Sequence, residues 1–255
     1  MTDAETGLWF EQGGSGEPVL LMIHGLGATA EVWRGVIDIA KDRWPGRWIA
    51  PDLRGHGRSA WGRPYSFGSH AADLARLIGD AQRGPLVVLG HSMGGVIGLT
   101  MATGLFSVDV SAVVGVGIKV SWNDQDLEWI RASVARPVRW FDTRGEATER
   151  FLRLAGVPLD EPTEGGLARS GVIEEGGRFR VAMDPAAPEV GPPPMEVLMA
   201  RPRATVRLAC GENDVLTSVA ELRQFDPSAV ELRGLGHNAH VDGPESVWLL
   251  VPDAN

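Results

Sequence analysis

Short apolar runs alternate with amphipathic stretches along the first half of this chain. Runs that are almost wholly apolar are typical of strands buried on both faces of a sheet, and they fall at residues 18–23, 48–50, 86–89 and 112–116. Residues 31–43 and 69–82 instead repeat apolar side chains at helical spacing, which predicts amphipathic helices. This alternation predicts an α/β fold, in which helices cover both faces of a mostly parallel, twisted sheet.

The alternation stops at about residue 120 and resumes near residue 204. The segment between them has two helix-like stretches, at 126–134 and 146–154, interrupted by loops rich in proline and glycine. Beyond it we expect two further strands and a short last helix, at residues 204–209, 229–232 and 245–250. The strand expected near the N-terminus, at 8–11, is also short.

This change of pattern predicts how the chain is organised. We expect residues 1–119 and 200–255 to form one core, and residues 120–199 to be an inserted, largely helical cap. The cap would lie over the carboxyl edge of the sheet, where folds of this architecture bind ligands. A long loop without structure of its own is the alternative, but ordered loops of such length are uncommon.

A G-x-S-x-G sequence, Gly90-His91-Ser92-Met93-Gly94, lies between a predicted strand and a predicted helix. In that setting it predicts a nucleophile elbow, a tight turn that strains the backbone of Ser92 and exposes its hydroxyl above the sheet edge. Gly90 and Gly94 lack the Cβ atoms that would collide as the strand and the helix pass. A glycine-rich turn without function is the alternative. His91 is expected to pack or to form local hydrogen bonds, since adjacent elbow residues point apart.

A serine nucleophile needs a general base, and the base needs a carboxylate to orient it. His237 lies in a glycine-flanked loop after a predicted strand and is the predicted base, with His240 as its rival. Asp214 follows another predicted strand and is the predicted orienting acid. Other carboxylates could take that place: Glu212, Asp124 and Asp126. The order Ser, Asp, His along the chain is that of the α/β-hydrolases.

With these residues in place, the chain resembles the cap-bearing, lipase- and esterase-like branch of the α/β-hydrolase superfamily. The resemblance rests on the elbow, on the two loops that carry Asp214 and His237, and on two further blocks, at residues 23–27 and 52–59. It implies an oxyanion hole made by the backbone N–H groups of Leu26 and Met93, and it implies no cofactor and no metal. The block at 52–59 is expected to be structural, with Asp52 and Arg54 bonding backbone groups or each other.

Composition and charge argue against some classes of binding partner. The chain has 255 residues and a net charge of −9, without a basic run, which argues against a nucleic-acid surface. A single cysteine, Cys210, excludes an internal disulfide. No apolar run is long enough for a signal peptide or a membrane span, so we expect a cytoplasmic protein that does not associate with membranes. The short sheet edge and the short last helix leave room for a partner surface, such as that of a homodimer.

The predicted cap is rich in aromatic side chains. Trp122, Trp129, Trp140 and Phe141 are expected to wall a binding pocket, which favours a small, partly apolar substrate. The predicted function is a serine hydrolase that cleaves a carboxylic ester, lactone or thioester through an acyl-enzyme. A carbon–carbon bond hydrolase or lyase using the same site is one alternative, and a small-molecule receptor that retains the triad is another. Haloalkane dehalogenase and epoxide hydrolase activities are disfavoured, because those relatives carry aspartate at the position of Ser92.

Overall fold

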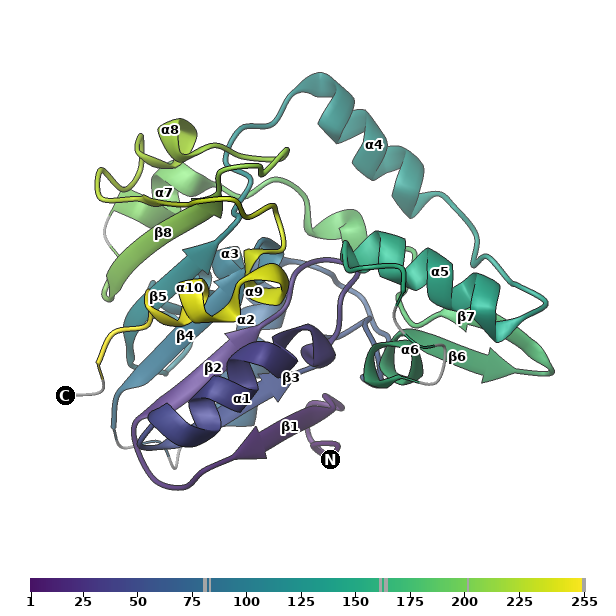
Figure 1. The fold of residues 1–255 in the computed structure, drawn as a ribbon, viewed down its shortest axis with the longest axis horizontal. Coiled ribbons are helices and arrows are strands. Elements are labelled where there is room, and N and C mark those ends of the chain that lie inside the picture. Colours follow the sequence, from purple (N-terminus) through teal and green to yellow (C-terminus); the bar gives the residue numbers. More distant parts are fainter. Residues whose placement is uncertain (80–81, 83, 161, 163–164, 201, 254–255) are drawn as a thin grey trace.

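A seven-stranded sheet runs through the middle of the molecule (Figure 1). The computed structural model describes residues 1–79, 82, 84–160, 162, 165–200 and 202–253. The strand order is β1-β3-β2-β4-β5-β8-β9, and every neighbouring pair is parallel except β1 and β3. The strands are β1 (Phe10–Gly13), β2 (Val19–Ile23), β3 (Arg47–Pro51), β4 (Leu86–His91), β5 (Val110–Val116), β8 (Thr205–Gly211) and β9 (Val230–Leu232). The α/β-hydrolase fold expected from the sequence is confirmed.

Helices cover both faces of this sheet, because its strands are apolar on both sides. Leu20 and Met22 of β2 pack in one apolar cluster, whereas Leu21 and Ile23 pack in the other, as alternating side chains of a strand must. One face is covered by α1 (Arg34–Arg43), α9 (Ala239–Asp242) and α10 (Pro244–Trp248). The other is covered by α2 (Phe67–Ile78), α3 (Met93–Met101), α7 (Met195–Ala200) and α8 (Val219–Leu222).

Several boundaries differ from the sequence-based expectation. A 3₁₀ turn, η1 (Ala30–Trp33), precedes α1, so the helix expected at 31–43 begins later. Helix α2 begins beyond Ser66, whose hydroxyl accepts a hydrogen bond from the Ser69 N–H, and ends at Gly79, which has a positive φ. The expected helix continued to residue 82, and part of that stretch, residues 80–81, lies outside the described residues. Strand β1 is displaced by two residues and α10 is shorter than expected.

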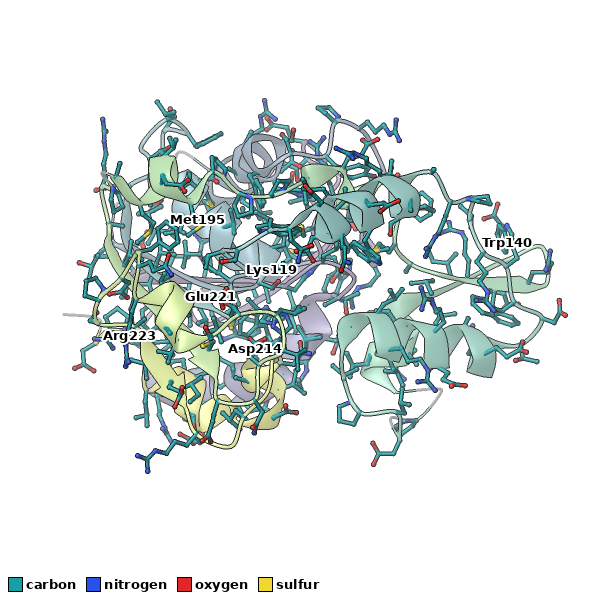
Figure 2. The ribbon with its side chains drawn as sticks, turned by 90° about the horizontal axis from the view of Figure 1, so that it is seen from above. Lys119, Trp140, Met195, Asp214, Glu221 and Arg223 are labelled. Carbon is teal, nitrogen blue, oxygen red and sulfur yellow. The ribbon has the colours of Figure 1, made fainter. Side chains whose placement is uncertain are left out.

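Most of the segment 120–199 forms a body beside the carboxyl edge of the sheet, whereas its last residues begin α7, which packs on the sheet (Figure 1). The body holds α4 (Asp124–Val134), α5 (Arg144–Ala155), α6 (Gly166–Gly171), the hairpin of β6 (Val172–Glu175) and β7 (Arg178–Val181), and the 3₁₀ turn η2 (Ala187–Val190). Seen from above, Trp140 lies at the far end of this body, away from Asp214 and Lys119 (Figure 2).

The hairpin in this segment was not expected from the sequence. Its strands have only four residues each, too few for a clear period, and Gly176 and Gly177 connect them with positive φ angles. Two glycines between short strands are a hairpin signal, because two-residue turns of this kind favour positive φ. The segment is largely helical, as expected, with this one short hairpin added. No helix among the described residues has the length and apolarity to span a bilayer.

Candidate active site

Ser92 occupies the sharp turn between β4 and α3. Its φ of 49° and ψ of −117° lie outside the regions that non-glycine residues favour, as expected of an elbow. A Cβ at Gly90 would collide with the backbone of Gly94 and Gly95, and one at Gly94 would collide with the carbonyl of Ile23. The glycines on either side of Ser92 therefore let the strand and the helix approach closely.

Asp214 and His237 are hydrogen-bonded to each other. The His237 Nδ1 atom lies 2.9 Å from Asp214 Oδ2 and 3.1 Å from Oδ1, although the residues are 23 positions apart in sequence. The Asp214 side chain is 0% exposed and that of His237 is 18% exposed. Because a carboxylate only accepts, Nδ1 must carry the proton, which leaves the Nε2 of neutral His237 free to accept one. Both Ser92 and His237 line the same cavity.

The rival residues lie elsewhere. His240 is buried against the Trp33 ring, 4.5 Å between centroids, and burial lowers its pKa to about 3. Glu212 accepts a hydrogen bond from the Gly234 N–H at 2.8 Å. Asp126 caps the start of α4 and pairs with Lys119 at 3.1 Å, and Asp124 stands beside it in the first turn. The structure therefore brings Asp214, and none of these, to His237.

The two backbone groups predicted to form an oxyanion hole lie in the wall of the cavity that holds Ser92. Leu26 follows Gly25 in the turn after β2, and both residues line the cavity with Met93. Met93 is the first residue of α3, so its N–H has no acceptor within the helix. In the described part of the chain, the Leu26 N–H donates no hydrogen bond either. Both donors are available to a ligand.

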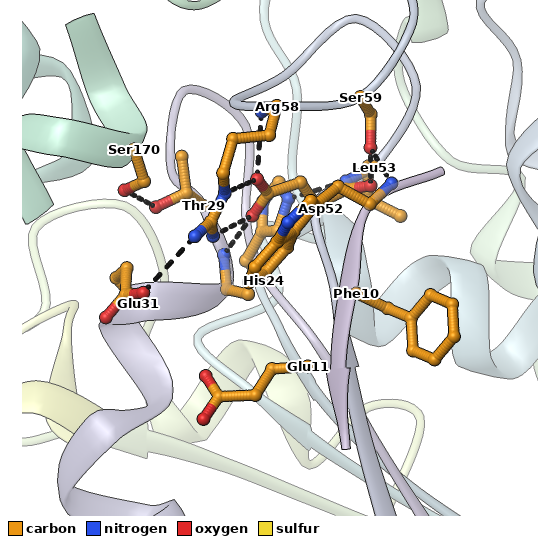
Figure 3. A network of polar contacts seen from close by, with 12 residues as sticks. Phe10, Glu11, His24, Thr29, Glu31, Asp52, Leu53, Arg58, Ser59 and Ser170 are labelled. Atoms are coloured by element: carbon orange, nitrogen blue, oxygen red, sulfur yellow. Dashed lines mark hydrogen bonds and ion pairs between the residues drawn. The ribbon is translucent and has the colours of Figure 1, made fainter. Parts of the chain in front are cut away.

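A buried polar network ties the turn after β2 to the block at 52–59 (Figure 3). The Leu53 N–H donates to His24 Nε2 at 2.9 Å, so the other ring nitrogen of His24 donates to the Gly25 carbonyl at 2.8 Å. Burial lowers the pKa of His24 to about 4 and keeps it neutral. Asp52 Oδ1 accepts from the Ala30 N–H at 2.8 Å. The block at 52–59 thus fixes both ends of the turn that carries Leu26.

The ion pairs in this block differ from those expected. Asp52 pairs with Arg58, whose Nε lies 2.7 Å from Asp52 Oδ2, and not with Arg54. Arg54 pairs instead with Asp73 of α2 at 2.6 Å. Asp52 is fully buried. The chain reverses in the tight turn at Gly55 and Gly57, which brings the Arg58 side chain back to Asp52. Of the two alternatives expected, bonding to backbone groups is confirmed: Asp52 accepts from backbone N–H groups, and Arg54 donates to the carbonyls of Gly62 and Pro64 at 3.3 Å.

The cavity above Ser92 has a volume of about 560 Å³. Most of its wall is apolar; Lys119 and Asp126 are its charged residues, and the imidazoles of His91 and His237 also line it. The apolar part comes from the core, from the segment 120–199 and from the loop after Asp214: Leu26, Phe67, Val96, Trp122, Trp129, Leu154, Val190, Pro193, Val215 and Leu216. An apolar wall with few polar groups suits a small, partly apolar ligand.

Two of the four aromatic residues predicted to wall the pocket are found there, namely Trp122 and Trp129. The other two are not. Phe141 is buried and its backbone pairs with Phe179 of β7, at N–O distances of 2.7 and 2.9 Å. Trp140 lies beside the Arg180 guanidinium at the far end of the segment (Figure 2). The unpredicted hairpin explains the error, since the Phe141 backbone pairs with β7 and the Trp140 ring lies near Arg180 of β7.

Sequence reasoning missed several residues of this site. Lys119 follows β5 and reaches the cavity, and Val215 and Leu216 reach it from the loop after Asp214. Asn238 ties the loop of His237 to the end of α5, through a 2.8 Å hydrogen bond from its Nδ2 to the Gly156 carbonyl. The position of these residues directly after a predicted strand or a predicted site residue could have identified them. No cluster suited to a metal ion occurs among the residues that the structure describes.

Residues 20–248 match the model of the alpha/beta hydrolase family. The chain belongs to the alpha/beta hydrolase family. This hydrolase is similar to 2-(acetamidomethylene)succinate hydrolase of Mesorhizobium japonicum, with 28% identity over 91% of this chain and 85% of that protein. It is also similar to lipase LipV of Mycobacterium tuberculosis, with 36% identity over 35% of this chain, a match that spans only 33% of the lipase.

Solved structures agree on the fold of this hydrolase. A crystal structure of E-2-(acetamidomethylene)succinate hydrolase has a TM-score of 0.79 and 25% identity, covering 95% of this chain and 92% of that one. The thioesterase domain from the curacin biosynthetic pathway has a TM-score of 0.76 and 21% identity, covering 95% and 94%. The family match and these structures place the chain among proteins with the alpha/beta hydrolase fold, and the chain spans about a third of the length of the first curated relatives it matches.

Proposed function

We propose that this hydrolase cleaves a carboxylic ester, lactone or thioester of a small, partly apolar molecule through a covalent acyl-enzyme on Ser92. The observation that carries the proposal is the bond between His237 and Asp214 at one wall of the cavity that Ser92 also lines. A serine hydrolase triad consists of a hydroxyl, an imidazole that acts on it and a carboxylate that orients the imidazole. Residues 1–119 and 200–255 would supply this chemistry and residues 120–199 would act as the cap.

The mechanism follows from the proton positions. His237 Nε2 removes the Ser92 proton as the oxygen attacks the substrate carbonyl, and Asp214 stabilises the imidazolium that forms. The resulting oxyanion receives hydrogen bonds from the backbone N–H groups of Leu26 and Met93, each worth roughly 10²–10³ in rate. His237 then protonates the leaving group, and a water molecule activated by the same imidazole releases the acid. No step needs a cofactor.

The wall of the cavity supports the substrate class. Apolar side chains surround Ser92, and the positive charge of Lys119 is paired with Asp126 at 3.1 Å. A neutral acyl group therefore loses little hydration on entering, whereas a free anion would have to compete with Asp126 for Lys119. Relatives named as a lipase, a methyl ester esterase and a thioesterase domain fit the same class of carbonyl substrate.

The test is an activity screen with purified protein and Ser92→Ala as the control. Short- and medium-chain p-nitrophenyl esters, thioesters, lactones and ring-fission diketones are the substrates. We expect steady turnover of at least one acyl substrate, which Ser92→Ala abolishes. Turnover of diketones alone would favour carbon–carbon bond cleavage. Absence of turnover, combined with a large melting shift on ligand binding, would favour a receptor, and either result would contradict the proposal.

A further inference from the structure

His91 lies directly before the proposed nucleophile, and the mechanism above does not use it. We propose that His91 is a positioning residue, whose imidazole holds the main chain of His237 and so keeps that base at a fixed place beside Ser92. This inference rests on the proposed function, since His237 needs to be held in this way only if it acts as the base.

The contact joins the two parts of the site directly. His91 is the last residue of β4 and is 3% exposed. Its Nε2 atom lies 3.0 Å from the carbonyl oxygen of His237, 146 positions away in sequence. A carbonyl oxygen only accepts, so the His91 Nε2–H is the donor. The strand that carries Ser92 is thereby bonded to the residue that carries the proposed base.

The rest of the ring leaves His91 no other role in hydrogen bonding. Its Nδ1 atom is buried and has no partner within the described residues. A Cβ built on Gly25 of the oxyanion turn would lie 2.8 Å from that nitrogen, so the ring fits only beside a glycine. A second proton on Nδ1 would have no acceptor. The ring is therefore neutral and fixed in the tautomer that donates from Nε2. Burial, followed by the neighbouring imidazoles of His240 and His237, holds the pKa of His91 well below its usual value.

The loop of His237 needs such a restraint. Gly234 has a φ of 72° and Gly236 precedes His237 directly, so glycines adjoin the base, while two residues before it the Leu235 carbonyl accepts a hydrogen bond from the Asn213 N–H at 2.9 Å. Asp214 fixes the ring at Nδ1 but does not fix the main chain. The Asn238 amide holds the next residue, but its partner, Gly156, lies in the segment 120–199. Of these three bonds, the one from His91 connects the His237 main chain to β4.

A positioning role makes a specific prediction about the kinetics. If the base lies about 1 Å from its productive place, proton transfer slows by roughly 10²-fold while substrate binding changes little. Loss of the His91 donor should therefore lower kcat and leave KM nearly unchanged. A residue that merely fills the core would instead lower stability, with no fixed pattern in kcat.

The experiment compares His91→Gln with His91→Asn. The amide nitrogen of glutamine reaches the place of the imidazole Nε2, whereas the shorter asparagine does not, so the two variants differ in the donor and little in polarity. His91→Leu removes the donor altogether. The control is His70→Leu in α2: His70 is also buried, neither of its ring nitrogens has a partner among the residues that the structure describes, and its ring stacks on Tyr65, away from the triad. kcat, KM, the rate of fluorophosphonate labelling and Tm are measured for each protein.

We expect His91→Asn and His91→Leu to lower kcat and the labelling rate by about 10–100-fold, with KM within about threefold. His91→Gln should stay within about fivefold of the wild type, and His70→Leu should keep its kcat whatever its Tm. If His91→Leu does not fold, the comparison of His91→Gln with His91→Asn still tests the positioning role. Equal rates for the two amide variants, or a loss confined to KM, would overturn the positioning role while the proposed function stands. A wild-type protein that neither turns over nor takes the label would overturn both.

Discussion

The carboxyl edge of the sheet and the segment 120–199 hold their residues in different ways. At the sheet edge, Ser92, Asp214 and His237 each stand at the end of a strand or in the loop after one, and short bonds such as His237–Asp214 fix their places. In the other segment, α5 buries Phe151 and Leu152, but α4 has no buried residue at all. Trp129 of α4 is 51% exposed although it lines the cavity.

Under the proposed function, the sheet edge carries out the chemistry and the segment 120–199 contributes to substrate selection. Groups that must meet within hydrogen-bonding distance stand on buried strands, where packing leaves them little freedom. The wall that meets the variable part of a ligand includes a helix with few packing contacts, and such elements open most readily. Substitutions at the sheet edge should therefore change kcat by large factors, whereas those on α4 should change KM modestly.

The largest effect is expected from removing the proposed base. His237→Ala should lower kcat by about 10⁴–10⁶-fold, because Ser92 would lose its proton acceptor. His240→Ala removes a buried ring that lies outside the cavity, so it should cost stability but keep kcat within about tenfold. Steady-state kinetics on the best ester from the screen measure both. If His240→Ala were the inactive one, the assignment of the base would be wrong.

A smaller loss is expected at the carboxylate. Asp214→Asn keeps the shape of the side chain but offers an amide N–H to His237 Nδ1, which would favour the wrong tautomer. kcat should fall by about 10³–10⁴-fold. Glu212→Gln is the matched control, because Glu212 bonds the Gly234 N–H instead of the imidazole. Comparable losses in both variants would remove the distinction between the two carboxylates.

Within the segment 120–199, the loss of stability on substitution should follow how deeply each side chain is buried. Phe151 is 1% exposed, and Phe151→Ala should lower the free energy of unfolding by about 3–5 kcal/mol, measured by urea denaturation. Trp129→Ala should lower it by less than about 1 kcal/mol, since half of that side chain already meets solvent. The same Trp129 variant should raise KM for medium-chain esters a few-fold and leave kcat unchanged. A large loss of stability from Trp129→Ala would show that α4 is anchored more firmly than its burial indicates.

The two regions should also differ in acid sensitivity, because all six histidines lie outside residues 120–199. Burial lowers the pKa of His24 to about 4 and those of His56, His70 and His240 to about 3. The unfolded chain binds these protons below its ordinary histidine pKa of about 6.5, whereas the folded core does not. The free energy of unfolding should therefore fall as the pH drops from about 6.5 toward 4, by up to roughly 1.4 kcal/mol per pH unit for each such histidine.

This acid effect can be measured by urea denaturation between pH 7.5 and 5. His70→Leu should reduce the pH dependence of the free energy of unfolding, because it removes one of the buried groups. Replacement of a residue in the segment 120–199, such as Trp129→Ala, should not change that slope. An unchanged slope in His70→Leu would mean that His70 binds its proton equally in the folded and unfolded states.

The sequence predicted the sheet edge better than the segment 120–199, for a physical reason. Ser92, Asp214 and His237 each follow an apolar run, so local pattern already placed them at one edge of a parallel sheet. The β6–β7 hairpin has strands of four residues, which is too short for periodicity to distinguish, and the places of Trp140 and Phe141 depend on it. The partner of Asp52 also could not be read locally, because Arg54 and Arg58 both lie within its reach along the chain and only the turn between them decides.

Covalent labelling tests most directly whether Ser92 is a nucleophile activated by His237. The protein is treated with a fluorophosphonate, digested, and the modified peptide is identified by mass spectrometry, in parallel with His237→Ala and Ser92→Ala. We expect a single adduct, on Ser92, in the wild-type protein. It should form at least about 10³-fold more slowly in His237→Ala and be absent from Ser92→Ala. An adduct on a different serine, or labelling of Ser92 at the same rate without His237, would contradict this expectation.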